Sequence, residues 1–194
     1  MGDGMKKVIL GGVLGGLVVF IWGMISWMVL PWHRGNFEQF QNGSAVQAVL
    51  VASAPKAGIY LLPGMHEKGE SISSDQEKAL MKQAHEQMEK GPFAFVAIRP
   101  NGVGPMGMLM IRSLIIQIVG AFLLTWLLLM AKIESYLERI GFFSILAVTA
   151  GVICFLPEWN WWGFPARYTL VGIADLVIGW SLAGIVIARL TSKG

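Results

Sequence analysis

Residues 8–30 read VILGGVLGGLVVFIWGMISWMVL, and none of their side chains is charged. A helix of about 20 mostly apolar residues is long enough to cross the hydrocarbon core of a bilayer. We therefore predict that this stretch spans a membrane. It is too long for the apolar part of a secretion signal, and no Ala-x-Ala-like site follows it, so we expect the helix to be retained.

Three further apolar segments follow nearer the C-terminus. Met106–Ala131 contains a single charged residue, Arg112, and Tyr168–Ala188 contains only Asp175. Ile140–Leu156 is shorter and could extend backwards to Tyr136. The sequence thus predicts a mainly α membrane protein with four transmembrane helices.

The composition of the whole chain agrees with this prediction. Of the 194 residues, 55% are hydrophobic and 14% are charged, and the mean hydropathy is +0.60. Soluble domains contain about 25% charged residues, so a soluble globular domain and a disordered chain are both excluded. The net charge of only +3 argues against a nucleic-acid partner.

Lysine and arginine in the short flanks predict the orientation, because these residues gather on the cytoplasmic side. Six of them would lie on one side of a four-helix arrangement: Lys6, Lys7, Lys132, Arg139, Arg189 and Lys193. The short loop on the other side carries only Arg167. We therefore expect cytoplasmic termini and residues 31–105 outside the cytoplasm.

Residues 31–105 show the signals of a small α+β domain between residues 1–30, which hold the first membrane helix, and residues 106–194, which hold the other three. The order is a helix from a capping box at Ser44 to Pro55, a strand over 58–62, a helix over 74–90 and a strand over 93–99. About 70 residues bury only a marginal core, so we expect this domain to lean on the membrane helices or on a partner.

Arg112 and Asp175 are predicted to form an ion pair. Each lies six or seven residues into its helix, which puts both roughly 10 Å below the outer surface at about 1.5 Å per residue. An ionised group inside the hydrocarbon layer is costly unless it is paired. The pair could lock two helices together, or it could form a polar site for a ligand, ion or proton; alternatively, Arg112 could extend to the lipid headgroups.

Small residues on the first and fourth helices predict close helix packing, because they let backbones approach. Such a glycine-rich face can pack against another helix of the same chain or against another subunit. These glycines are Gly11, Gly12, Gly15 and Gly16 in the first helix, and Gly172 and Gly179 beside Asp175 in the fourth.

Tryptophans gather near the outer surface, where the amphipathic indole ring is favoured. They are Trp22, Trp27 and Trp32 around the end of the first helix, and Trp159, Trp161 and Trp162 in an expected loop over residues 157–165. They indicate an interfacial belt or, alternatively, a pocket for a lipid-like or quinone-like molecule. His33 and Glu158 border this belt and could supply its polar groups.

Metal, cofactor and catalytic motifs are missing from the sequence. His66–Glu70 and His85–Glu89 both read His-Glu-x-x-Glu, but a zinc protease requires histidine at the last position. The chain has no phosphate-binding loop, no Gly-x-Ser-x-Gly nucleophile elbow and no Cys-x-x-Cys. We expect no metal, no cofactor and no catalytic residues.

Two motifs, FIWGMISWMVLPWH over residues 20–33 and NWWGFPARYTLVGIADLVIGW over residues 160–180, resemble a family of small, uncharacterised bacterial inner-membrane proteins with this four-helix layout. The resemblance implies a bacterial inner-membrane location and implies no activity.

Three functions stay open at this point. The first is a non-enzymatic accessory, assembly or interaction subunit of an envelope complex, with a membrane-protein partner or as a homo-oligomer. The second is a binder or carrier of a lipid or quinone, using the aromatic belt and the Arg112–Asp175 pair. The third, a membrane enzyme using His33, Glu158 or Asp175, is the weakest, because no motif joins two of these groups.

Overall fold

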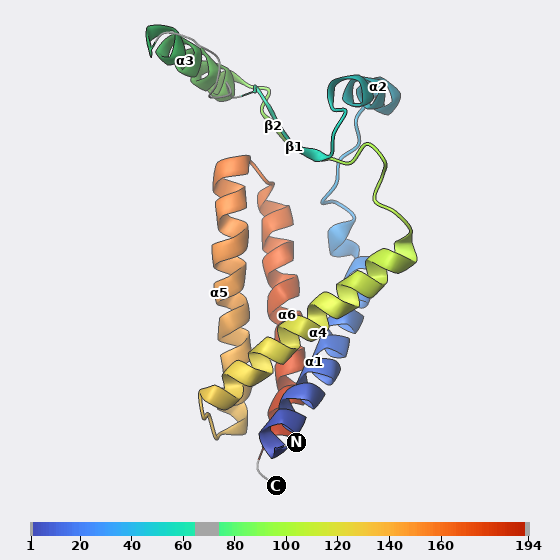
Figure 1. The fold of residues 1–194 in the computed structure, drawn as a ribbon, viewed down its shortest axis with the longest axis vertical. Coiled ribbons are helices and arrows are strands. Elements are labelled where there is room, and N and C mark those ends of the chain that lie inside the picture. The colour runs from blue at the N-terminus through green and yellow to red at the C-terminus, as the bar shows by residue number, and fades with distance from the viewer. Residues whose placement is uncertain (1, 65–73, 193–194) are drawn as a thin grey trace. The chain divides into compact units, whose positions relative to one another are not determined.

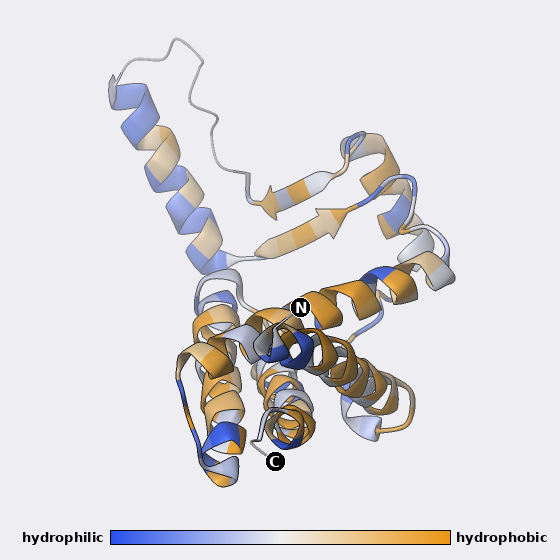
Figure 2. Cartoon of the chain, turned by 60° about the horizontal axis from the view of Figure 1, so that its bottom comes forward, coloured by the Kyte–Doolittle hydropathy of each residue, from blue (hydrophilic) through white to orange (hydrophobic). Residues whose placement is uncertain are grey.

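Four long helices make up most of the computed structural model, which describes residues 2–64 and 74–192. They are α1 (Asp3–Met28), α4 (Met106–Met130), α5 (Tyr136–Trp162) and α6 (Ala166–Thr191). Each is long and apolar enough to cross a membrane, and Figure 2 shows that hydrophobic residues predominate along them. The four apolar helices predicted from the sequence are confirmed, as expected of a multi-pass membrane protein.

The chain divides into two compact units, Met1–Glu38 with Gly104–Gly194 and, separately, Gln39–Val103. The sequence placed the first boundary at residue 31 instead. Residues 31–38 stay with the long helices because a short 3₁₀ helix, η1 (Pro31–His33), packs on α1 and α6. This difference puts His33 in the helical unit.

Helix α1 lies at the centre of the helical unit. It packs against both α4 and α6, while α5 packs along α6 and α4 contacts α5 and α6 only slightly. In Figure 1, α4 crosses α1 obliquely, α5 and α6 run side by side, and both ends of the chain lie at the same end of this unit. Helices α4 and α6 are therefore joined mainly through α1.

Glycines bring α1 close to its neighbours. A Cβ atom on Gly16 would lie 2.5 Å from the Cα of Ile118 in α4, and one on Gly12 would lie 3.0 Å from the Cβ of Phe122. The first distance leaves no room for a side chain at Gly16 and the second is a tight contact at Gly12, so these glycines let the two backbones approach closely. A Cβ on Gly11 would lie 2.6 Å from the side chain of Thr125 in α4. One on Gly15 would lie 2.6 Å from the side chain of Ile187 in α6.

The hydrophobic core lies toward the end of the unit that holds the chain termini. It consists of buried side chains from all four long helices: Val19, Leu128, Phe143, Ala183 and Ile187. Three of these lie near the C-terminus of α4, the N-terminus of α5 or the C-terminus of α6, which meet at that end.

Helix α5 is longer than the sequence predicts. The expected loop over residues 157–165 is wrong, because the helix continues through Pro157 to Trp162. Proline has a φ angle suited to a helix and removes only one backbone donor, so a helix that is stabilised elsewhere can contain it. The helix ends at Gly163, whose φ of +71° favours glycine.

The second unit has the predicted order of elements. Helix α2 (Gly43–Ser53) precedes strand β1 (Gly58–Leu62), and α3 (Ser74–Lys90) precedes β2 (Ala94–Ile98). The strands pair antiparallel, with Tyr60 opposite Val96.

The predicted capping box at Ser44 is wrong. The Asn42 side chain caps α2 by accepting a 3.1 Å hydrogen bond from the backbone N–H of Ala45. The hydroxyl of Ser44 instead donates to the same Asn42 oxygen at 3.0 Å.

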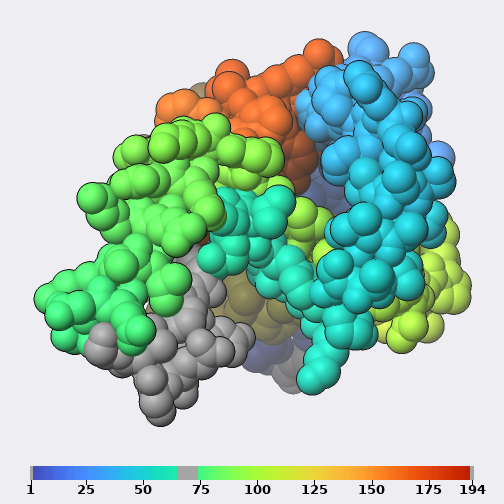
Figure 3. Space-filling view, turned by 90° about the horizontal axis from the view of Figure 1, so that it is seen from above, coloured from blue at the N-terminus to red at the C-terminus, as the bar shows by residue number. Residues whose placement is uncertain are grey.

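This second unit has almost no core of its own. Within residues 39–64 and 74–103, Ala54 is the only buried residue. Figure 3 shows α2, in cyan, and α3, in green, as separate masses that do not pack on each other. The marginal core expected from the sequence agrees with this burial pattern.

Candidate functional site

A turn after α1 places a histidine against the helical unit. Leu30 is extended, as is usual before proline, and Pro31 starts η1 with its fixed φ angle. The chain therefore bends back over α1, and His33 becomes buried with only 6% of its surface exposed.

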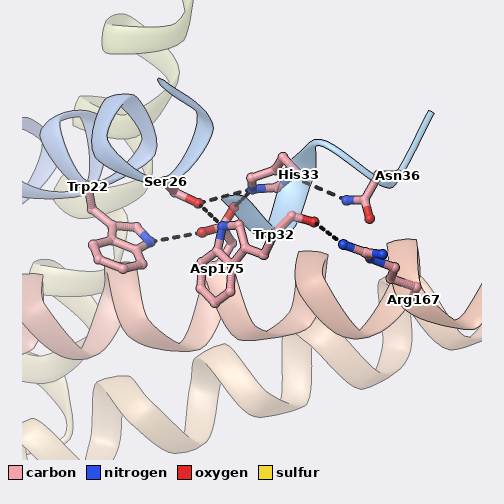
Figure 4. Close-up of polar contacts among 7 residues, drawn as sticks. All are labelled: Trp22, Ser26, Trp32, His33, Asn36, Arg167 and Asp175. Carbon is pink, nitrogen blue, oxygen red and sulfur yellow. Dashed lines mark hydrogen bonds and ion pairs between the residues drawn. The ribbon is translucent and has the colours of Figure 1, made fainter. Parts of the chain in front are cut away.

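His33 pairs with Asp175 of α6. Its Nε2 lies 2.8 Å from Oδ2 of the carboxylate, and the two side chains are only 7% and 17% exposed. The other oxygen, Oδ1, accepts a 3.1 Å hydrogen bond from the indole N–H of Trp22 in α1. The carboxylate is thus held by two N–H donors from outside α6 (Figure 4).

Polar groups contact both nitrogens of the imidazole ring. Toward α6, Nε2 of His33 faces the carboxylate of Asp175. At the other side of the ring, the side-chain amide of Asn36 lies 3.3 Å from Nδ1. These contacts at both nitrogens fix the orientation of the ring.

Tryptophans enclose this pair. Trp27 stacks on the His33 ring with the centroids 4.0 Å apart and the planes 12° from parallel. Trp32 donates its indole N–H to the fully buried hydroxyl of Ser26 over 2.8 Å, and that hydroxyl lies 3.0 Å from Nε2 of His33. The polar groups are therefore shielded by aromatic rings.

A second contact from α6 holds the turn in place. The guanidinium of Arg167 donates to the backbone carbonyl of Trp32 over 3.4 Å. It also lies so close to Gly35 that a Cβ there would be 2.5 Å from it. The segment after α1 is thus attached to α6 at two points, Arg167 and Asp175.

A cavity of about 320 Å³ opens beside the His33–Asp175 pair. Its wall is mostly aromatic and apolar, with contributions from all four long helices and the segment after α1. The aromatic residues are Trp22, Trp27, Phe155, Tyr168 and Trp180, and the polar ones are His33, Asn36, Gln117 and Asp175. No lysine or arginine is among the described residues that line it.

The predicted Arg112–Asp175 pair is wrong. Asp175 bonds to His33 and Trp22, whereas Arg112 lies on an exposed face of α4. Equal depth along two helices does not bring two side chains together, and here α1 lies between α4 and α6.

The other predicted site residues lie at the end of α5. Glu158 and Trp161 are exposed, and neither they nor Trp162 lines the cavity. The structure therefore brings together only His33 and Asp175 of the six ligand-binding candidates.

The fourth-helix glycines lie at helix contacts. A Cβ on Gly172 would be 2.5 Å from the ring of Phe155, and one on Gly179 would be 2.9 Å from the indole of Trp22. Both partners line the cavity, so these glycines set the positions of two of its aromatic walls.

Sequence reasoning did not identify Ser26, Asn36, Gln117 or Tyr168. One signal was present: Trp22 and Ser26 are four residues apart and so share a face of α1, and a serine is unusual in so apolar a stretch. Asn36 and Tyr168 had no such signal. The position of Asn36 depends on the turn after α1, and that of Tyr168 on how α6 packs beside this turn.

The described part of the chain, residues 2–64 and 74–192, contains no group of three or more His, Cys, Asp or Glu that could hold a metal. His85 lies 3.3 Å from Glu89 on the exposed surface of α3, as a simple pair. The other His-Glu-x-x-Glu motif, His66–Glu70, lies outside the described residues.

Comparisons with protein-family models, curated proteins and solved structures find no match to this chain.

Proposed function

We propose that this chain is a multi-pass membrane protein that binds a small uncharged hydrophobic molecule, such as a quinone, in the cavity beside His33 and Asp175. The observation that carries the proposal is an aromatic-walled cavity with a buried polar pair at one side. Small-molecule sites in proteins are typically apolar clefts of ~300–1,000 Å³ with a few fixed polar groups. The cavity, at about 320 Å³, has this character.

The charge of the cavity favours an uncharged ligand. The Asp175 carboxylate repels anions, and no lysine or arginine is among the described residues of the wall, so a phosphate group finds no cationic partner there. A ligand with carbonyl or hydroxyl groups finds unused hydrogen-bonding capacity instead. In the described chain, the Gln117 amide and Tyr168 hydroxyl have no hydrogen-bond partner, and the buried Oδ1 of Asn36 has none either.

The proposed location is the bacterial inner membrane, with both termini in the cytoplasm. The site lies near the end of α1 and the start of α6, at the opposite end of the helical unit from the termini. With the orientation predicted from the lysines and arginines, the cavity lies near the periplasmic face. A ligand dissolved in the bilayer would reach it laterally.

The test is saturable binding of decylubiquinone to the purified protein in nanodiscs, followed by quenching of tryptophan fluorescence. Three indoles, those of Trp22, Trp27 and Trp180, line the cavity and would report a bound quinone ring. We expect Asp175→Asn to weaken binding at least tenfold. Glu158→Gln is the matched control, since it neutralises an exposed carboxylate outside the cavity and should bind as the wild type does. Quenching that does not saturate, or that is unchanged in Asp175→Asn, would contradict the proposal.

A second proposed function, as an accessory subunit of an envelope complex, is favoured by the surface of the second unit. That unit leaves large apolar side chains exposed, including Phe40, Val49 and Val51 at 73%, 62% and 69%. Exposed apolar surface of this kind suits a protein partner.

For this second function, the test is gentle purification from native membranes with mass spectrometry of the particle. We expect a stoichiometric partner protein that Val51→Glu releases. Gln47→Glu is the control, because it adds the same charge at an exposed polar position of α2. A particle with no other protein would contradict the subunit function and leave ligand binding unaffected.

A further inference from the structure

The glycines of α1 are of two kinds. Gly11, Gly12, Gly15 and Gly16 all face a neighbouring helix within about 3 Å, so a side chain at any of them would collide. At Gly23, and at Gly4 in the first turn of the helix, a Cβ would meet nothing within 4 Å. Packing therefore explains the first four glycines, but the absence of a side chain at Gly23 leaves open space.

Two hollows lie beside Gly23. The cavity beside His33 is lined in part by Gly23, and a second groove of about 270 Å³ lies between α1 and α4. Four residues line both: Val19, Gly23, Trp27 and Gln117. The two hollows are therefore adjacent, and Gly23 is the smallest of the residues that they share.

The groove differs from the cavity in chemistry. Its own lining is almost entirely apolar and flexible: Phe20, Met24, Met28 and Met110, with the single hydroxyl of Ser113. It has no charged residue among the described residues that line it. Methionine is unbranched and adapts to irregular apolar shapes, which suits a flexible hydrocarbon chain better than a rigid ring.

We infer that the ligand of this site is a two-part amphiphile, with an uncharged polar head in the cavity beside His33 and a long apolar tail that passes Gly23 into the groove between α1 and α4. This inference rests on the proposed ligand-binding function and specifies the chemical class of the ligand. The cavity alone, at about 320 Å³, is near the lower limit of the ~300–1,000 Å³ typical of small-molecule sites, and the adjacent groove provides a further hollow of about 270 Å³.

The absence of cations sets the head apart from that of a phospholipid. Neither hollow is lined by a lysine or arginine among the described residues, and Asp175 adds a negative charge. A prenylated or alkylated quinone, with carbonyl groups and a hydrocarbon tail, has the required chemistry.

The experiment compares two probes on two matched variants. The probes are decylubiquinone and the same ring without its tail, 2,3-dimethoxy-5-methyl-1,4-benzoquinone, measured by fluorescence quenching in nanodiscs. Gly23→Leu adds a side chain at a residue that lines both hollows. Gly141→Leu adds the same side chain to α5, at another helical position where a Cβ meets nothing within 4 Å. Because both variants are measured in the same bilayer, partitioning of the tail into lipid affects them equally.

We expect Gly23→Leu to weaken decylubiquinone binding at least tenfold and to change binding of the tail-less ring less than threefold. Gly141→Leu should bind both probes as the wild type does. A second variant, Ser113→Leu, narrows the groove from α4 at a residue outside the cavity and should give the same selective loss.

Each alternative result has its own meaning. Binding of decylubiquinone that is unchanged in both Gly23→Leu and Ser113→Leu overturns the tail inference and leaves the proposed cavity intact. Equal loss of both probes also overturns it. If neither probe binds the wild type, the proposed function itself has failed.

Discussion

The two halves of α1 are both rich in apolar residues but differ in what their residues contact. The first half carries Gly11–Gly16, and its backbone lies so close to α4 that no side chain fits between them. The second half carries Trp22 and Trp27, which line a cavity of about 320 Å³. Apolar composition alone therefore does not fix packing. Small side chains allow two helices to close, whereas large rings joined by polar contacts leave room for a ligand.

The tryptophan half is held by directional bonds in place of close packing. The carboxylate of Asp175 accepts from Trp22 and His33, and the hydroxyl of Ser26 accepts from Trp32. Buried hydrogen bonds to a charged group contribute about 1.5–3 kcal/mol each, so a few of them can replace the contacts that the cavity removes. The half of α1 with Gly11–Gly16 is thus packed directly on α4, and the half with Trp22 and Trp27 lines the cavity.

The largest loss of stability is expected from adding a side chain in the glycine-rich half of α1. Gly16→Val would put a branched side chain against the backbone of Ile118, and we expect it to lower the free energy of unfolding by about 3 kcal/mol or more, the upper end of overpacking costs. Thermal unfolding in detergent, followed by tryptophan fluorescence, measures it. Gly141→Val is the control in open space and should lie within about 0.5 kcal/mol of the wild type. Equal stability of the two variants would remove the distinction between the halves.

The second largest loss of stability is expected from changes to the His33–Asp175 pair. We expect His33→Gln and Asp175→Asn each to cost about 2 kcal/mol, because each removes a buried hydrogen bond that involves a charged group. The double variant should cost less than the sum by about 1 kcal/mol, since the two residues are in direct contact. Unfolding free energies of the four proteins of this cycle are compared under one condition. Additive costs would show that the pair does not hold α6 to the turn after α1.

A smaller effect is expected at Ser26. Ser26→Ala leaves the indole N–H of Trp32 without its acceptor in a buried place, at a cost of about 1 kcal/mol. Thr149→Ala is the control, because the exposed hydroxyl of Thr149 bonds only to the carbonyl of Ile145 in its own helix. The unfolding temperature should fall for the first variant and stay close to the wild-type value for the second.

The sequence predicts those features that depend on residues close together along the chain, such as the presence and the ends of a helix. The hydropathy of residues 8–30 is enough to identify α1, and the glycine and proline after Lys90 are enough to end α3. The position of a residue around a helix axis depends on which helices become neighbours, and that is a property of the whole fold. His33 illustrates what the sequence does not reveal. Its burial depends on Pro31, which turns the chain back onto α1, and on Asp175, which lies on a helix distant in sequence.

The smallest change in stability is expected at Arg112. This residue tests directly whether depth counted from the sequence can predict a contact. Depth can be counted from the sequence at about 1.5 Å per residue, but the counted depth says nothing about the direction in which a side chain points. In the structure Arg112 is exposed, and Asp175 has other partners. We therefore expect Arg112→Gln to change the free energy of unfolding by no more than about 0.5 kcal/mol, and to add to Asp175→Asn without coupling. A cycle that shows coupling between Arg112 and Asp175 similar to that expected for His33 and Asp175 would contradict the structure and restore the pair that the sequence predicts.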